Sequence, residues 1–193
     1  MKKEELFDKL RRNTARQYDM PDQQKLQAIH YNNVVEQFAE MSRTVGGRVK
    51  RISRADDVNT VITELYPDAK VFASALPYIN IAQRNPDTVA EAGDLNGTDV
   101  AILEGEVGVA ENGCIWVPQT MKEKAVMFIS EELVIIIDAA SIVNNMHEGY
   151  RRIKVPELGY GCWISGPSKT ADIEQALVMG AQAARGVTVL IRE

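Results

Sequence analysis

The sequence predicts an α/β fold: a three-layer α/β/α sandwich with a mainly parallel sheet, preceded by N-terminal helices. Residues 133–137 are wholly apolar, which is typical of a strand buried on both faces of a parallel sheet. Segments with strand character alternate along the chain with segments whose apolar residues recur at helical spacing. The length of 193 residues suits one domain with a single large core.

Within this single domain, a helical arm over residues 1–45 is expected to pack on an α/β domain over residues 46–193. Residues 2–17 are highly charged, and Leu6 and Leu10 are the main apolar pair. This first segment is therefore either a helix that packs on a neighbouring subunit or a frayed terminus.

The other elements follow from the same patterns. Apolar residues three to five positions apart favour a helix over residues 26–45, which Gly46-Gly47 would end. The dipeptide Asn112-Gly113 predicts a hairpin turn, because glycine adopts positive φ at no steric cost. Residues 76–96 are expected to be mostly loop. The predicted strands are 48–52, 70–75, 99–103, 107–110, 114–117, 133–137, 162–165 and 187–191, and the further helices are 56–65, 141–150 and 171–184.

Composition and charge exclude several classes of protein. Lys and Arg number 22 against 27 Asp and Glu, so the net charge of -5 argues against nucleic acid as a partner. A membrane-spanning helix needs about 20 apolar residues, and no such run is present. The N-terminus has mixed charge where a signal peptide would be apolar, so we expect a cytoplasmic protein.

Cysteine and histidine usage predicts no metal site. The two cysteines, Cys114 and Cys162, lie far apart in sequence and suit a reducing compartment. An iron–sulfur cluster needs about four ligands, so this chain is not expected to hold one alone. His30 and His147 show no metal-ligand spacing.

The strongest local candidate for a binding site is a loop with hydroxyl groups and a lysine that would precede the last helix. Its candidate anion-binding residues are Ser165, Gly166, Ser168, Lys169 and Thr170. The unpaired N–H groups and the dipole of a helix start favour an anion, and Lys169 adds positive charge. The alternative is ordinary capping, in which Ser168 or Thr170 caps the helix, and Asp172 with Glu174 favours its N-terminal dipole.

A second candidate is the turn between two predicted strands, where Glu111 precedes Asn112 and Gly113. A carboxylate at the mouth of a sheet acts as a nucleophile, base or hydrogen-bond acceptor, so Glu111 is the candidate catalytic residue and Asn112 and Gly113 join the ligand site. If Glu104 and Glu106 converge on Glu111, like-charge repulsion would raise one pKa. The alternative is an exposed hairpin with a solvated Glu111.

Asp138 is a further candidate because it ends the buried strand, where α/β proteins often place ligand-binding groups. The alternative is that Asp138 caps the following helix. The residues counted as supporting the site are Glu104, Glu106, Asp138 and Asp172.

At these residues the chain resembles the LUD-domain family, whose members include lactate utilisation protein C. The resemblance rests on Gly166-Pro167-Ser168-Lys169-Thr170-Ala171-Asp172-Ile173-Glu174, on Leu177-Val178-Met179-Gly180-Ala181 after it, and on Val109-Ala110-Glu111-Asn112-Gly113-Cys114-Ile115. It covers roughly residues 45–193. The chain departs from the family at Gln182-Ala183-Ala184, where many members have His-Gly-Pro, so a histidine role cannot be carried over.

The resemblance implies the fold of the sugar-phosphate isomerase and CoA-transferase superfamily. It also implies a role in oxidising L-lactate to pyruvate alongside iron–sulfur oxidoreductase subunits, which would hold the clusters. We therefore expect a protein that binds a small anionic metabolite or cofactor between the Glu111 turn and residues 165–170. Homo-oligomerisation stays open, and fold likeness alone does not fix function.

Two alternatives remain. Ala110-Glu111-Asn112-Gly113 resembles the Ser-Glu-Asn-Gly element of class I CoA-transferases, which implies an acyl- or CoA-transferring enzyme with Glu111 as its nucleophile. However, Ala110 replaces the serine, and the Gly-rich oxyanion-binding motif is not found. The other alternative is a non-catalytic assembly subunit that uses the charged N-terminal helix.

Overall fold

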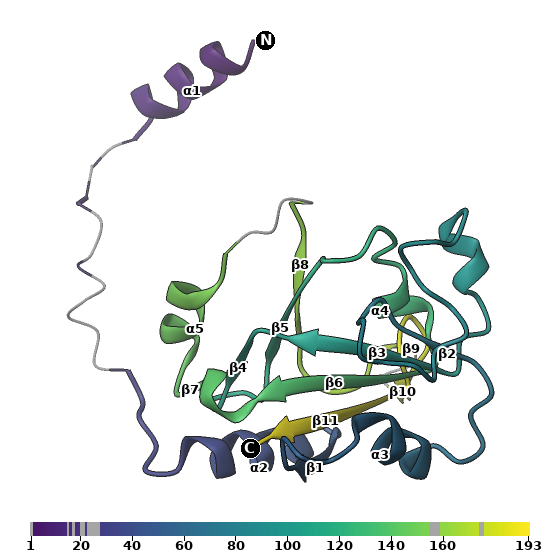
Figure 1. The fold of residues 1–193 in the computed structure, drawn as a ribbon. Helices are drawn as coiled ribbons and strands as arrows, with labels where there is room; N and C mark the ends of the chain where they lie inside the picture. Colours follow the sequence, from purple (N-terminus) through teal and green to yellow (C-terminus); the bar gives the residue numbers. More distant parts are fainter. Residues whose placement is uncertain are drawn as a thin grey trace.

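The computed structural model describes residues 2–14, 16, 18–19, 22, 28–154, 159–173 and 176–193, with only the backbone for 171–173 and 176–177. A five-stranded sheet forms its centre, and every neighbouring pair of strands in it is parallel. Figure 1 shows β3, β6 and β11 side by side with their arrows pointing the same way. In spatial order the strands are β1 (Arg48–Ile52), β11 (Gly186–Arg192), β6 (Glu132–Asp138), β3 (Val100–Gly105) and β2 (Phe72–Ala73). Their carboxyl ends therefore meet at one edge of the sheet.

The central strand β6 is buried on both faces, as its apolar sequence predicts, and all five residues from Leu133 to Ile137 are buried. One face of the sheet packs against α3 (Val58–Leu65) through Val61 and Ile62. Asp57 caps α3 by accepting hydrogen bonds from the N–H groups of its first turn. The helix predicted over 56–65 is confirmed.

The other face of the central sheet packs against α2 (Val34–Thr44), α4 (Val126–Ile129) and a second sheet. The second sheet has the order β7 (Ile142–Val143), β4 (Val107–Val109), β5 (Ile115–Pro118) and β8 (Gly161–Ile164). β4 and β5 are antiparallel and are joined at Asn112-Gly113, which confirms the predicted hairpin. The α/β fold with a mainly parallel sheet and flanking helices is thus confirmed, and one flanking layer also contains this smaller sheet.

The helix predicted over residues 171–184 is wrong. The chain instead forms β9 (Lys169–Ile173) and β10 (Ala176–Met179), which pair antiparallel. A short apolar run such as 176–179 fits a strand as well as a buried helix, so its spacing does not separate the two. The β-branched residues Thr170, Ile173 and Val178 favour the extended backbone.

The helix predicted over residues 141–150 is only partly right. The structure has η3 (Ala139–Ser141), then β7, and then α5 (Met146–Arg152). The β-branched residues Ile142 and Val143 pair with β4. α5 begins after Asn145, whose side chain accepts a hydrogen bond from the Glu148 N–H. The helical spacing of the apolar residues therefore indicated one element where the chain forms three.

The N-terminal helices are shorter than the sequence predicts. α1 (Lys3–Arg12) has no buried residue, and Figure 1 shows it apart from both sheets. α2 begins after Asn33, which accepts a hydrogen bond from the Glu36 N–H, and the part of the prediction at 26–27 lies outside the described residues. Gly46 has a φ of 91° and ends α2 as predicted. A short helical turn, η2 (Ala92–Leu95), lies in the predicted loop. None of the described helices is long and apolar enough to cross a membrane.

Candidate functional site

The loop from Ser165 to Lys169 is fixed between the end of α2 and the segment before β11. Gly166 has a φ of 67°, and a Cβ there would lie 2.5 Å from the Val45 carbonyl oxygen, so only glycine fits. The Lys169 ammonium donates a hydrogen bond to the same carbonyl, and Val45 is the C-cap residue of α2. On the other side, the Ser168 N–H donates to the Ala184 carbonyl at 2.8 Å. The loop is therefore held by backbone contacts at both ends.

This loop forms one wall of a cavity of about 280 Å³, here called the loop cavity. The polar wall is Ser165, Gly166, Ser168 and Lys169, and the apolar wall includes Met127, Phe128, Leu133, Ile164, Ala184 and Val187. An apolar pocket with a few polar groups on one side is typical of sites for small molecules. Four of the five residues predicted for the loop site line it.

Two other predicted residues of this loop are placed differently. Thr170 lies in β9 and is not among the residues that line the loop cavity. The side chain of Asp172 lies outside the described residues. Because strands and not a helix follow this loop, the predicted helix start that would favour an anion is wrong, and so is the predicted capping by Ser168 or Thr170. Lys169 instead places its charge at the C-terminus of α2, where the helix dipole favours a cation.

The Glu111 turn meets the loop through its neighbours. The Ser165 hydroxyl donates a hydrogen bond to the Asn112 carbonyl at 2.9 Å, and Gly113 packs on the backbone of α2 at Ser42. Burial raises the pKa of the half-buried Cys114, which follows this turn, although a hydrogen bond with Ser165 opposes the rise. This thiol is therefore not activated as a nucleophile.

Glu111 itself turns toward the start of α5. Its carboxylate oxygen Oε2 accepts a hydrogen bond from the Met146 N–H at 3.0 Å, and the residue is exposed. Met146 is the first residue of α5, where a negative charge is favourable. Glu111 does not line the loop cavity. The geometry thus matches the exposed-hairpin interpretation, with a structural role at the helix start.

The carboxylates predicted as supporting residues lie elsewhere, at the carboxyl ends of the parallel strands. Glu104, Glu106 and Asp138 line a cavity of about 210 Å³, here called the carboxyl-edge cleft, together with Arg192 and Ser141. Arg192 forms an ion pair with Glu104 at 3.1 Å. The sequence candidates are therefore divided between two sites, with Glu111 in neither set of lining residues.

Asp138 has the position that the sequence predicts and also acts as a cap. It accepts a hydrogen bond from the Ala140 N–H at 3.0 Å and forms an ion pair with Arg54. The Ala140 hydrogen bond lowers the pKa of Asp138, and Arg54 adds to this. The capping interpretation is confirmed, for the short η3 turn.

Sequence reasoning missed three residues of this edge, Arg54, Tyr78 and Arg192. Burial raises the pKa of Tyr78 to about 12, Glu104 adds to the rise, and Arg192 opposes it. The phenol is therefore a neutral hydrogen-bond donor at physiological pH. Arg54 and Arg192 each lie just after a predicted strand, where parallel sheets place ligand-binding groups, and this position could have identified them. Tyr78 lies in a long loop and carried no such signal.

Comparison with protein-family models shows which family this chain belongs to. The model of the LUD domain matches residues 93–191, which is more than half of the chain. The chain belongs to the LUD-domain family. The resemblance stated from the residue 166–181 segment is thereby confirmed, although the matched region is shorter than the predicted 45–193. No curated protein matches the chain.

A solved structure shows the same fold as this LUD-domain protein. It is the crystal structure of a DUF162 family protein from Deinococcus radiodurans, with 14% sequence identity and a TM-score of 0.64. The match covers 86% of this chain and 100% of that chain. At this identity the likeness supports the fold and carries no residue roles.

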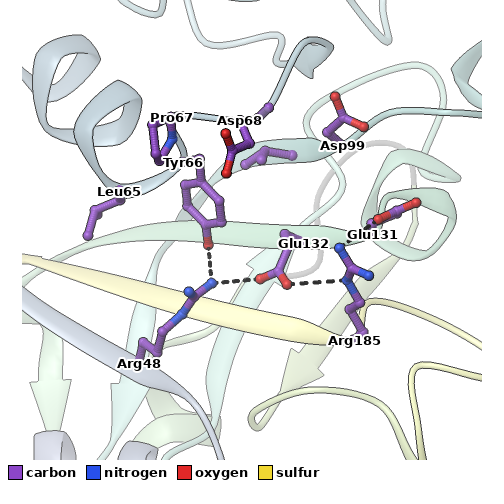
Figure 2. A pocket seen from close by; sticks show the side chains of 11 residues that line it. Arg48, Leu65, Tyr66, Pro67, Asp68, Asp99, Glu131, Glu132 and Arg185 are labelled. Carbon is purple, nitrogen blue, oxygen red and sulfur yellow. Dashed lines mark hydrogen bonds and ion pairs between the residues drawn. The ribbon is translucent and has the colours of Figure 1, made fainter.

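A further cavity, of about 250 Å³, lies at the opposite, amino edge of the sheet of this LUD-domain protein (Figure 2). Arg48 donates hydrogen bonds to the Tyr66 hydroxyl at 2.9 Å and to Glu132 at 2.7 Å. Arg185 forms ion pairs with Glu131 at 2.9 Å and with Glu132 at 3.6 Å. These charged side chains satisfy one another, so we interpret this cavity as a structural ion-pair network.

Metal binding has no visible basis in the part of the chain that the structure describes. There, no group of three or more His, Cys, Asp or Glu side chains is arranged to hold a metal ion.

Proposed function

We propose that this LUD-domain protein binds a small anionic metabolite or cofactor group in the loop cavity and serves an organic-acid oxidation system. The observation that carries the proposal is the gathering of Ser165, Gly166, Ser168 and Lys169 on one wall of a single cavity. The oxidation of L-lactate to pyruvate is the reaction we assign to that system, with iron–sulfur oxidoreductase subunits as partners. Membership of the LUD-domain family supports this assignment.

The charge of the loop cavity suits an anion. Lys169 is its single charged residue among the described lining residues, and none of these is acidic. An ammonium has three hydrogen-bond donors, and Lys169 uses one of them on the Val45 carbonyl. The hydroxyl of Ser168 lies on the same wall. The apolar wall would accept the carbon skeleton, so the site suits an organic acid better than a bare inorganic ion.

The surroundings of Glu111 disfavour the acyl-transfer alternative. A glutamate nucleophile must face its substrate with a free carboxylate. Glu111 instead accepts a hydrogen bond from the first N–H group of α5. A homo-oligomer and a cytoplasmic location remain expectations, and the net charge of -5 disfavours nucleic acid as a partner.

Isothermal titration calorimetry on the full chain tests the loop cavity. The probes are L-lactate, pyruvate and butyrate, and the variants are Lys169→Met and Ser168→Ala. We expect Lys169→Met to weaken binding at least tenfold, which is about 1.4 kcal/mol, because it removes the one cation in the cavity. The control is Lys70→Met, which removes an exposed lysine outside the cavity and should leave affinity unchanged.

Thermal melts of each variant separate a binding defect from a folding defect, because Lys169 also contacts the end of α2. If both variants keep the affinity of the unmodified chain for every probe, the loop cavity is not the anion site.

A further inference from the structure

The carboxyl-edge cleft carries a cluster of charges that the proposed function does not use. Glu104, Asp138 and Arg192 lie on the adjacent strands β3, β6 and β11. In the register of the sheet, Arg192 is opposite Asp138, and Glu104 is opposite Ile136. Ile136 and Leu190 belong to the core cluster under α3, and side chains two positions apart in a strand share a face. All three charged side chains therefore project on the α3 face at the carboxyl ends, where open α/β sheets bind ligands.

The charge of the cleft disfavours a simple anion. It collects three carboxylates, on Glu104, Glu106 and Asp138. Against these stand two guanidinium groups, on Arg192 in the cleft and on Arg54, which pairs with Asp138. The balance is one negative charge, opposite to that of the loop cavity. A ligand with both a positive and a negative group matches this arrangement better than an anion does.

Two of these charged groups have unused bonding capacity. The Nε atom of Arg192 is buried and has no hydrogen-bond partner in the structure. Buried polar groups normally find partners, so this guanidinium is not saturated by Glu104 alone. Glu106 is exposed, and among the described residues its carboxylate has no ion pair or side-chain hydrogen bond. The buried Nε is itself out of a ligand's reach, but the Arg192 side chain is 24% exposed in the cleft and donates to Glu104 through Nη2. Its other N–H groups can therefore receive a carboxylate, and Glu106 can receive a cation.

Tyr78 adds a neutral donor beside these groups. It is 38% exposed, and both Glu104 and Arg192 lie close enough to shift the pKa of its phenol. A tyrosine phenol is protonated at neutral pH, so it can donate to a carboxylate without adding to the charge of the cleft.

We propose that the carboxyl-edge cleft binds a small α-amino acid, with its carboxylate at Arg192 and its ammonium group at Glu106. The volume of about 210 Å³ suits an amino acid with a short side chain. The side chain of Leu76 at the cleft provides the apolar contact for it. The cleft shares no lining residue with the loop cavity, so this inference is independent of the proposed function.

Ligand-observed saturation-transfer NMR on the full chain, with affinities from calorimetry, tests the cleft. The probes are glycine, L-alanine and L-serine, with L-lactate and ethylamine as analogues that each lack one charge. We expect an amino acid to bind, and Glu106→Gln and Arg192→Gln each to weaken it at least tenfold. Glu111→Gln and Lys70→Met are matched controls outside the cleft and should leave that affinity unchanged.

The analogues decide the ligand class. The analogues are therefore read by competition, because L-lactate in the loop cavity does not displace an amino acid from the cleft. Displacement of L-alanine by L-lactate or ethylamine at concentrations as low as those at which L-alanine itself binds would show that one of the two charged contacts is not made, and would overturn the assignment. The assignment would also be overturned if none of the amino acids bound at concentrations up to about 10 mM. Arg192 lies in β11 and its loss can unfold the chain, so the exposed Glu106→Gln variant keeps the test decisive.

Discussion

Glu132 shows how a charged side chain is held at the end of a buried parallel strand. Its side chain is 18% exposed and lies between Arg48 and Arg185, as Figure 2 shows. The neighbouring position in β11 is Gly186, and a Cβ there would lie 2.1 Å from the Glu132 carboxylate. The glycine thus makes room for the carboxylate, and the two arginines neutralise it. The spacing of charges in the sequence gives no sign of this arrangement.

Replacing Glu132 with alanine is expected to lower the free energy of unfolding by about 1–2 kcal/mol, because two charge-assisted contacts are lost at a mostly buried position. The matched control is Glu131→Ala, whose side chain is 55% exposed and pairs with Arg185 alone. That change should cost about 0.5 kcal/mol or less. Urea unfolding at pH 7 measures both. Equal losses for the two variants would contradict the structural role given to Glu132.

At the scale of elements, the loop from Ser165 to Lys169 is positioned by tertiary contacts and not by a following helix. Gly166 lies against the Val45 carbonyl, and Ser165 reaches the Asn112 carbonyl. The sequence identified this loop correctly as a cluster of polar groups. It misassigned the element after the loop, because residues 176–179 fit both a helix and a strand and the choice depends on pairing with β9.

Gly166→Ala provides a direct test of how the loop is positioned. We expect it to destabilise the chain and to weaken anion binding in the loop cavity, because the new methyl group would meet the Val45 carbonyl oxygen at 2.5 Å. The control is Gly97→Ala, which has a similar φ of 76° but no atom within 4 Å of the added Cβ. The control should cost only about 1–2 kcal/mol of backbone strain and leave binding intact. Thermal melts measure the stability of both variants, and titrations measure their lactate affinity. Equal losses of stability and affinity in the two variants would count against a tightly held loop.

At the scale of the whole molecule, the sequence was most informative where burial is extreme. The apolar run of β6 predicted a strand covered on both faces, and the alternation of elements predicted the parallel sheet. The site was harder, because Glu104 and Glu111 are close in sequence but have different surroundings. Glu104 projects from the central sheet toward Arg192, whereas Glu111 contacts α5 beyond the second sheet. Their separation depends on where the chain leaves one sheet for the other after Gly105, which local spacing does not encode.

Acid stability is a property of the whole molecule, because carboxylates in different parts of the fold share one direction of shift. The Lys70 and Val71 N–H groups lower the pKa of Asp99, and the Ala140 N–H followed by Arg54 lowers that of Asp138. For Glu148, burial opposes the shift, but hydrogen bonds from Asn144 and the nearby His30 outweigh it and lower the pKa. The folded chain therefore holds these protons less tightly than the unfolded chain does.

The free energy of unfolding should consequently be nearly constant from about pH 7 to pH 5.5 and fall below about pH 4.5. The sign follows from the depressed pKa values, since each contribution is present above the unfolded pKa and is lost as the pH falls through the folded one.

Asp99→Asn should lower stability at pH 7 and make the acid decline shallower, because its two N–H donors lose a charged acceptor. The exposed Asp68→Asn is the control, with the decline expected to stay steep. Urea midpoints measured between about pH 3 and pH 7 test this, and an Asp99→Asn curve parallel to that of the unmodified chain would rule out the linkage.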